Sequence, residues 1–143
     1  MSAKEGYKFE DLSVGMSHER THTITAEDID LFAKVSGDHN PIHVDDEYAK
    51  NTPFGQRVAH GALTASYISG ILGNDLPGPG AIFTHLEMRF RRPVFIGDTV
   101  TARAEIIETI ERGKRATLKI TCSVNGKVVV GGEAKVMVPG RED

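Results

Sequence analysis

Gly61-Ala-Leu-Thr-Ala-Ser-Tyr-Ile-Ser-Gly-Ile-Leu72 is the stretch of sequence that decides the fold. Apolar residues are spread around most of its helical circumference, and small residues occupy the positions between them. A helix of this kind packs inside a protein rather than along its surface. Pro77-Gly78-Pro79-Gly80 then interrupts regular structure. We therefore expect a buried helix over about 61–72, followed by a sharp change of structure.

Downstream of this helix the hydrophobic period changes to two. Alternation runs through 82–91 and returns in three later segments. Each of these has one apolar face: Val100, Ala102, Ala104 and Ile106; Ala116, Leu118, Ile120, Cys122 and Val124; Val128, Val130, Ala134, Val136 and Val138. Asn125-Gly126 is typical of a type I′ hairpin turn, and 111–114 reads as another turn. The expected fold is α+β, an antiparallel sheet wrapped around a long central helix at about 61–72.

The first half of the chain reads as mainly helical. Thr25 is followed by Ala-Glu-Asp, a pattern that predicts an N-cap with acidic residues in the first helical turn. Gly37 is typical of the left-handed residue that ends a helix. Pro41 favours extended backbone at Asn40, because proline disfavours the helical conformation in the preceding residue. A second short helix is expected over 45–51.

Length and composition exclude several classes of protein. The 143 residues, 39% hydrophobic and 26% charged, fit one globular domain over residues 1–143. A net charge of −3 without a basic block argues against a nucleic-acid-binding protein. No apolar run approaches the ~18 residues of a membrane-spanning helix. The single cysteine, Cys122, and an N-terminus without an apolar signal segment favour the cytoplasm or another reducing compartment.

Ser36-Gly-Asp38-His-Asn40-Pro41-Ile-His43 is the densest polar cluster of the sequence. Asp38 and His43 flank the bend that proline fixes, so the bend must bring their side chains together. A histidine with a pKa of about 6.5 suits general-base work, and a partly buried aspartate can serve as a general acid. The alternative is structural: Asp38 caps the loop, and His43 is an ordinary surface histidine.

His60-Gly61 opens the buried helix. The N-terminus of a helix offers free N–H groups and a partial positive charge, and glycine allows a ligand to approach the backbone closely. The Gly61 amide is therefore a candidate for stabilising an oxyanion. The alternative is that Gly61 only relieves crowding where a loop enters the helix, and His60 itself is expected to be structural. The six histidines are not grouped as a metal site requires.

These segments resemble the MaoC-like (R)-specific enoyl-CoA hydratases. That family has an apolar helix leading into Ser/Thr-Gly-Asp-x-Asn-Pro-aliphatic-His, and a later helix opened by His-Gly. Here the two motifs stand at Phe32–His43 and Val58–Gly61. The likeness continues through Leu76–Gly80 and Pro93–Asp98 and spans roughly 20–138. It implies the hot-dog fold, which agrees with the sheet-around-helix architecture expected from periodicity.

The resemblance also implies an activity, the reversible syn hydration of trans-2-enoyl-CoA to (R)-3-hydroxyacyl-CoA in fatty-acid or polyhydroxyalkanoate precursor metabolism. His43 would take a proton from water and Asp38 would deliver one to C2, while the Gly61 amide binds the thioester oxygen. Asn40 would support the site, and Ser69 matches a position that lines the pocket in relatives. Asp38 and His43 are expected to titrate as a coupled pair, so the acid and base of each direction stay open.

The implied substrate carries coenzyme A or an acyl-carrier-protein arm. Arg89 and Arg91 alternate onto one strand face, with Arg92 beside them, and arginine forks suit nucleotide phosphates. The alternative is a solvated strand face whose charges protect a sheet edge. No redox cofactor and no metal are implied. A homodimer, or a dimer of dimers, joined through sheet edges is expected by resemblance.

Three rival functions remain. An acyl-CoA thioesterase of the hot-dog type would need a nucleophile or base that the Asp38–His43 pair does not obviously supply. A carrier-protein dehydratase with its acid on the central helix is disfavoured, because 61–72 contains no acidic residue. A non-catalytic subunit that only binds acyl thioesters would be expected to have lost the acid or the base, and both are present here.

Overall fold

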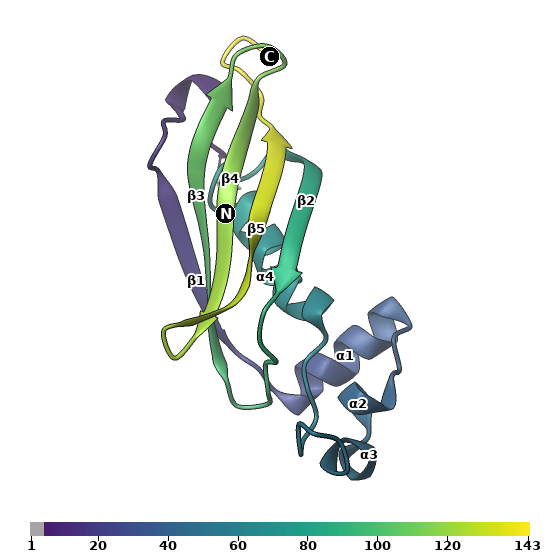
Figure 1. The fold of residues 1–143 in the computed structure, drawn as a ribbon. Helices are drawn as coiled ribbons and strands as arrows, with labels where there is room; N and C mark the ends of the chain where they lie inside the picture. The colour runs from purple at the N-terminus through teal and green to yellow at the C-terminus, as the bar shows by residue number, and fades with distance from the viewer. Residues whose placement is uncertain (1–4) are drawn as a thin grey trace.

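The computed structural model describes residues 5–143, whose backbone forms one five-stranded antiparallel sheet (Figure 1). In sheet order the strands are β1 (Ser17–Thr23), β3 (Thr99–Ile110), β4 (Arg115–Val124), β5 (Lys127–Met137) and β2 (Ile82–Phe90). A 3₁₀ turn at Phe9–Asp11 precedes β1. The helices are α1 (Ala26–Ser36), α2 (Pro41–Val44), α3 (Asp46–Lys50) and α4 (Gly61–Asn74).

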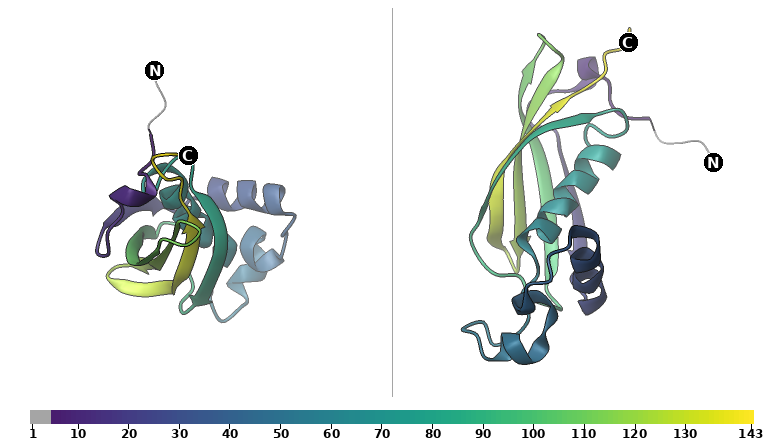
Figure 2. Two further views of the ribbon diagram at one scale, coloured as in Figure 1. Left: turned by 90° about the horizontal axis from the view of Figure 1, so that it is seen from above. Right: turned by 90° about the vertical axis from the view of Figure 1, so that its right-hand side faces the viewer.

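The long helix α4 lies in the hollow of the curved sheet, as the end-on and side views show (Figure 2). It buries Leu63, Thr64, Ile68, Ile71 and Leu72 against the sheet. This confirms the α+β fold with a central helix, which continues two residues beyond the predicted end at 72. The expectation of burial on nearly all sides is wrong for the single chain, because one sheet covers only one side. The exposed side carries small residues: Ala62, Ser66, Ser69 and Gly73.

The predicted inward faces of β3, β4 and β5 are confirmed with one correction. Val128 was placed on the inner face of β5, but it is 40% exposed, whereas Val129 is 2% exposed. The register between β4 and β5 shifts after Cys122, and this irregularity reverses the alternation at the start of β5. The predicted hairpin turn is present: Asn125 and Gly126 both have positive φ, at 51° and 77°.

Strand β1 was not predicted from the sequence, and the reading of the first half as mainly helical is corrected by it. Its residues, Ser-His-Glu-Arg-Thr-His-Thr, contain no apolar side chain and show no hydrophobic period. Polar contacts hold it instead: Arg20 Nη2 donates to Asp75 Oδ1 at 3.1 Å, and His18 Nε2 lies 3.3 Å from Asp75 Oδ2. Asp75 is buried at the C-terminal end of α4, so the ion pair joins β1 to the central helix.

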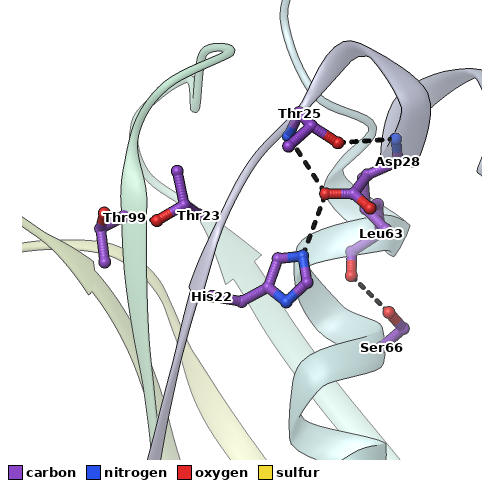
Figure 3. A network of polar contacts seen from close by, with 7 residues as sticks. All are labelled: His22, Thr23, Thr25, Asp28, Leu63, Ser66 and Thr99. Carbon is purple, nitrogen blue, oxygen red and sulfur yellow. Dashed lines mark hydrogen bonds and ion pairs between the residues drawn. The ribbon is translucent and has the colours of Figure 1, made fainter.

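Helix α1 begins and ends as the sequence predicts. The Asp28 amide donates to Thr25 Oγ1, and the Asp28 carboxylate accepts the Thr25 amide, both at 3.1 Å. His22 Nε2 on β1 lies 3.0 Å from Asp28 Oδ2, and this hydrogen bond is the main cause that lowers the pKa of Asp28 (Figure 3). Gly37 ends the helix with a φ of 80°.

The segment after α1 returns to the start of α4 through two short helices. The predicted helix over 45–51 is confirmed as α3, whereas α2 was not predicted. Proline opens α2 at its first position, where the missing N–H has no intrahelical partner to lose. Helices α1, α2 and α3 gather at the end of the sheet where α4 begins (Figures 1 and 2). Among residues 5–143, no helix is both long and apolar enough to cross a lipid bilayer.

We expect the contact between α4 and the sheet to dominate stability. Ile68 is fully buried on α4, so Ile68→Ala should lower the free energy of unfolding by about 2–5 kcal/mol, through lost burial and the cavity left behind. Ser69→Ala on the exposed side is the matched control and should change it by less than about 0.5 kcal/mol. Urea unfolding followed by circular dichroism, at one protein concentration, measures both. Equal stability of the two variants would contradict this placement of α4.

Candidate active site

Three short-range hydrogen bonds shape the loop between α1 and α2. The Asp38 amide donates to Ser36 Oγ, the Asn40 amide to Asp38 Oδ1, and the Ile42 amide to Asn40 Oδ1, each at 3.1 Å. Each small polar side chain thus accepts from an amide two residues ahead, the usual way in which Ser, Asp and Asn stabilise turns. Asn40 also serves as the N-cap of α2. The residue types of the motif are therefore explained by the bend that they build.

The bend directs the ring of His43 toward the start of α4. His43 Nδ1 lies 2.7 Å from the carbonyl oxygen of Val58. Because a carbonyl oxygen only accepts, Nδ1 carries the hydrogen, and the lone pair of a neutral His43 ring is on Nε2. The backbone of Val58 thus sets both the orientation and the tautomer of His43. The free Nε2 is the arrangement that a general base requires.

A buried arginine, Arg57, holds the backbone carbonyl of His43 in place. Arg57 Nε donates to the His43 carbonyl oxygen at 2.5 Å, and Arg57 Nη2 donates to Asp30 Oδ1 of α1 at 2.6 Å. The Arg57 side chain is 7% exposed, so its charge is held by these two acceptors rather than by water. Arg57 was not predicted as a site residue. Its contacts join α1, α2 and the strand-like segment at 57–59.

His60 connects the two predicted catalytic residues. Its Nε2 lies 3.0 Å from the Asp38 carbonyl oxygen, and its ring stacks on His43 with centroids 4.0 Å apart and an interplanar angle of 27°. The ring of Phe32 covers it from the other side at 4.9 Å. One donor atom from each of Asp38, His43 and His60 falls within 4.8 Å of the others. The structure therefore brings Asp38 and His43 together, and His60 lies between them.

The environment of His60 favours its neutral form. The residue is 2% exposed, and burial is the main cause that lowers its pKa. Since Nε2 donates to a carbonyl, Nδ1 holds the lone pair, and Nδ1 is buried without a hydrogen-bond partner among residues 5–143. A neutral ring can stack on His43 without placing two positive charges face to face. The sequence predicts a structural role for His60, and its contacts define that role: it holds the Asp38 carbonyl and packs on the ring of His43.

The same three residues could be taken for a metal site. His43 and His60 each use one ring nitrogen on a backbone carbonyl and keep the other, as histidine ligands of metals also do. One observation favours proton transfer over chelation. The two rings lie nearly parallel, so their in-plane lone pairs do not point at a common centre.

A cavity of about 680 Å³ opens beside His43 and Gly61. Gly61 is the first residue of α4, and the N-cap His60 supplies no side-chain cap to the first turn. A Cβ at Gly61 would lie 2.7 Å from Cε1 of Phe90, so a larger residue would require this exposed ring to shift. The crowding explanation considered for Gly61 therefore stays open, and the amide role stays a prediction.

The remaining predicted residues divide into two groups. Asn40 and Arg91 line the cavity with His43 and Gly61, together with Arg92. Arg89 is exposed on β2 and Ser69 is exposed on α4, and neither lines the cavity of the single chain. Their predicted roles in substrate binding stay predictions.

This chain is similar in sequence and in structure to several known proteins. Residues 11–128 match the family model described as MaoC like domain. The (R)-specific enoyl-CoA hydratase of Rhodospirillum rubrum is 50% identical over 133 residues, covering 93% of this chain and 92% of that protein. The 3-hydroxybutyryl-CoA dehydratase of Methylorubrum extorquens is 47% identical and covers 94% and 86%. The unliganded R-hydratase PhaJ1 of Pseudomonas aeruginosa superposes with a TM-score of 0.90 at 39% identity, covering 95% and 88%. The chain therefore belongs to the MaoC-like domain family and has its hot-dog fold.

Proposed function

We propose that this chain catalyses the reversible syn hydration of trans-2-enoyl-CoA to (R)-3-hydroxyacyl-CoA. The observation that carries the proposal is the meeting of a carboxylate, Asp38, and an imidazole with a free Nε2, His43, next to the N-terminus of α4. Hydration requires one group that takes a proton from water and one that supplies a proton to carbon. The adjoining cavity has room for an acyl thioester.

In the proposed reaction His43 Nε2 removes a proton from water as the water oxygen bonds to C3. The electron pair of the C2–C3 double bond moves toward the thioester carbonyl, and C2 then takes a proton from the Asp38 carboxyl. The site returns to its starting state when a proton passes from His43 to Asp38, whose donor atoms lie within 4.8 Å. One water is added in total, and dehydration uses the same groups in reverse.

The Gly61 amide is proposed to stabilise the negative charge that develops on the thioester oxygen. The first N–H groups of a helix have no partners within the helix, and the helix dipole adds a partial positive charge there. Asn40 is proposed to hold the bend that places Asp38 beside His43 and His60. No cofactor enters the proposed cycle, since protons and water are its only other participants.

The names of the relatives support both directions of the reaction. A hydratase that acts on an enoyl-CoA and a dehydratase that acts on 3-hydroxybutyryl-CoA describe one equilibrium approached from opposite sides. Coenzyme A rather than a carrier protein is therefore the proposed thioester carrier. The proposed location is the cytoplasm, since the only cysteine, Cys122, is a buried free thiol.

A second copy of the chain is proposed to pair along β2. This strand is at one edge of the sheet, and nearly all its residues are exposed. Exposed large apolar side chains accompany this free edge: Ile82, Phe83, Leu86 and Phe90. An apolar unpaired edge is a template for strand pairing, and the exposed side of α4 leaves a further surface for a partner to cover. The proposed assembly is a homodimer or a dimer of dimers.

The test of the proposed activity uses crotonyl-CoA. We expect loss of the conjugated thioester absorbance and formation of (R)-3-hydroxybutyryl-CoA, identified by chiral chromatography. Release of free thiol without hydration would favour the thioesterase. Tight binding of crotonyl-CoA and longer enoyl-CoAs without turnover of any of them would favour the non-catalytic subunit.

Removal of either proton-transfer group should abolish most turnover. Asp38→Asn and His43→Ala are each expected to lower kcat for crotonyl-CoA by at least ~10²-fold, the usual contribution of a general acid or base. Circular dichroism checks that both variants fold. The matched control is His39→Ala, an exposed imidazole next to Asp38, which should keep kcat within a few-fold. Near-normal turnover in either of the first two variants contradicts the mechanism.

The proposed assembly is tested by light scattering coupled to size exclusion. We expect the mass of two or four chains for the unchanged protein. Leu86→Asp on β2 should shift the mass toward one chain, because a buried charge would oppose the pairing. Val35→Asp, on the exposed apolar side of α1, is the control and should leave the mass unchanged. A single-chain mass for the unchanged protein would exclude the dimer.

A further inference from the structure

Five cations gather at one end of the outer face of the sheet: Arg89, Arg91, Arg92, Lys119 and Lys127. Within residues 5–143, the ion pairs of the structure involve other basic residues and none of these five. The chain as a whole carries a net charge of −3. A cluster of cations without close ion-pair partners produces a local positive potential that attracts anions.

Four of them, Arg91, Arg92, Lys119 and Lys127, line a hollow of about 820 Å³. Its floor is Gly131, which pairs with Thr121 on β4 and with Arg89 on β2. Glycine leaves this position without a side chain, and a Cβ built there would lie 3.8 Å from Arg91 Nε. Lys119 lies in the next row of the sheet, which also contains Glu105, Glu133 and Glu87, so the positive surface ends at this lysine.

The hollow adjoins the proposed active site. Arg91 and Arg92 line both the cavity beside His43 and the hollow above Gly131. An elongated ligand with its reacting end at His43 would cross the end of β2 at these arginines and enter the hollow. The lining also changes in character along this path, from mainly apolar side chains near Gly61 to cations and Thr121.

We infer that this hollow, the phosphate hollow, binds the phosphate groups of the nucleotide end of a coenzyme A thioester. The inference rests on the proposed function and adds Arg92, Lys119, Lys127 and the floor at Gly131 to the predicted phosphate ligands Arg89 and Arg91. Arginine and lysine form charge-assisted hydrogen bonds to phosphate oxygens. A carrier-protein arm brings one phosphate, whereas the nucleotide end of coenzyme A brings a diphosphate and a 3′-phosphate, which matches several unpaired cations better.

The test compares crotonyl-CoA with crotonyl-pantetheine, which has the same reacting group and no phosphate. In the double variant Lys119→Glu/Lys127→Glu, we expect kcat/KM for crotonyl-CoA to fall at least ~10-fold more than kcat/KM for crotonyl-pantetheine, mainly through KM. Raised salt should weaken the preference of the unchanged protein for crotonyl-CoA in the same way. Lys135→Glu, on the same face of β5 but beyond the acidic row, is the charge-matched control and should leave the preference unchanged.

A second variant alters the shape of the hollow without altering its charge. Gly131→Val should fit the strand, since a Cβ there meets only ordinary contacts, and should reduce the same preference by filling the floor. The inference is overturned if the variants affect both thioesters equally, or if they slow only a crotonyl-carrier protein. Failure of the proposed function looks different, because the unchanged protein would then hydrate neither crotonyl-CoA nor crotonyl-pantetheine.

Discussion

The proposed active site depends on one buried imidazole, His60. Its Nε2–H donates to the Asp38 carbonyl, its ring stacks on His43, and the next residue is Gly61 at the start of α4. The proposed acid, the proposed base and the helix N-terminus are thus joined by a single side chain. Burial keeps this imidazole neutral, so His43 can take up a proton beside it without facing a second positive charge. Proton transfer needs such fixed geometry, because small displacements of the reacting groups are costly.

The position of His60 is in turn set by the packing of α4. The helix is held along its length by buried side chains that share one core with those of β3, β4 and β5, and at its C-terminal end by the ion pair between Arg20 and Asp75. At its N-terminal end the Ala59 amide donates to the Val94 carbonyl at 2.7 Å, which ties the entry to the helix to the segment after β2. On the other side of the site, Arg57 donates to the His43 carbonyl and to the Asp30 carboxylate. The first turn of α4 therefore faces the loop between α1 and α2, and contacts on both sides hold this loop in place.

Much of this arrangement follows from local sequence. The central helix, the inward faces of three strands and the caps of α1 are determined by periodicity and by residues such as Thr25 and Gly37. Strand β1 could not be found in this way, because its contacts to α4 are polar and its partner Asp75 is distant in sequence. The stacking of His60 on His43 could not be predicted from the sequence either, because it depends on how two loops meet. The motif residues were recognised from the family pattern, and the structure adds the bonds that explain the pattern.

The exposure of Asp38 links the chemistry to the proposed assembly. A carboxyl group in water is ionised at neutral pH, and it serves as a general acid only where its surroundings favour the protonated form. In the single chain Asp38 is exposed, while His43 and Gly61 are partly covered. The proposed cycle therefore needs a cover over Asp38, which bound acyl thioester or a second copy of the chain would supply. The apolar free edge at β2 and the uncovered side of α4 are the surfaces that the single chain leaves for the proposed second copy.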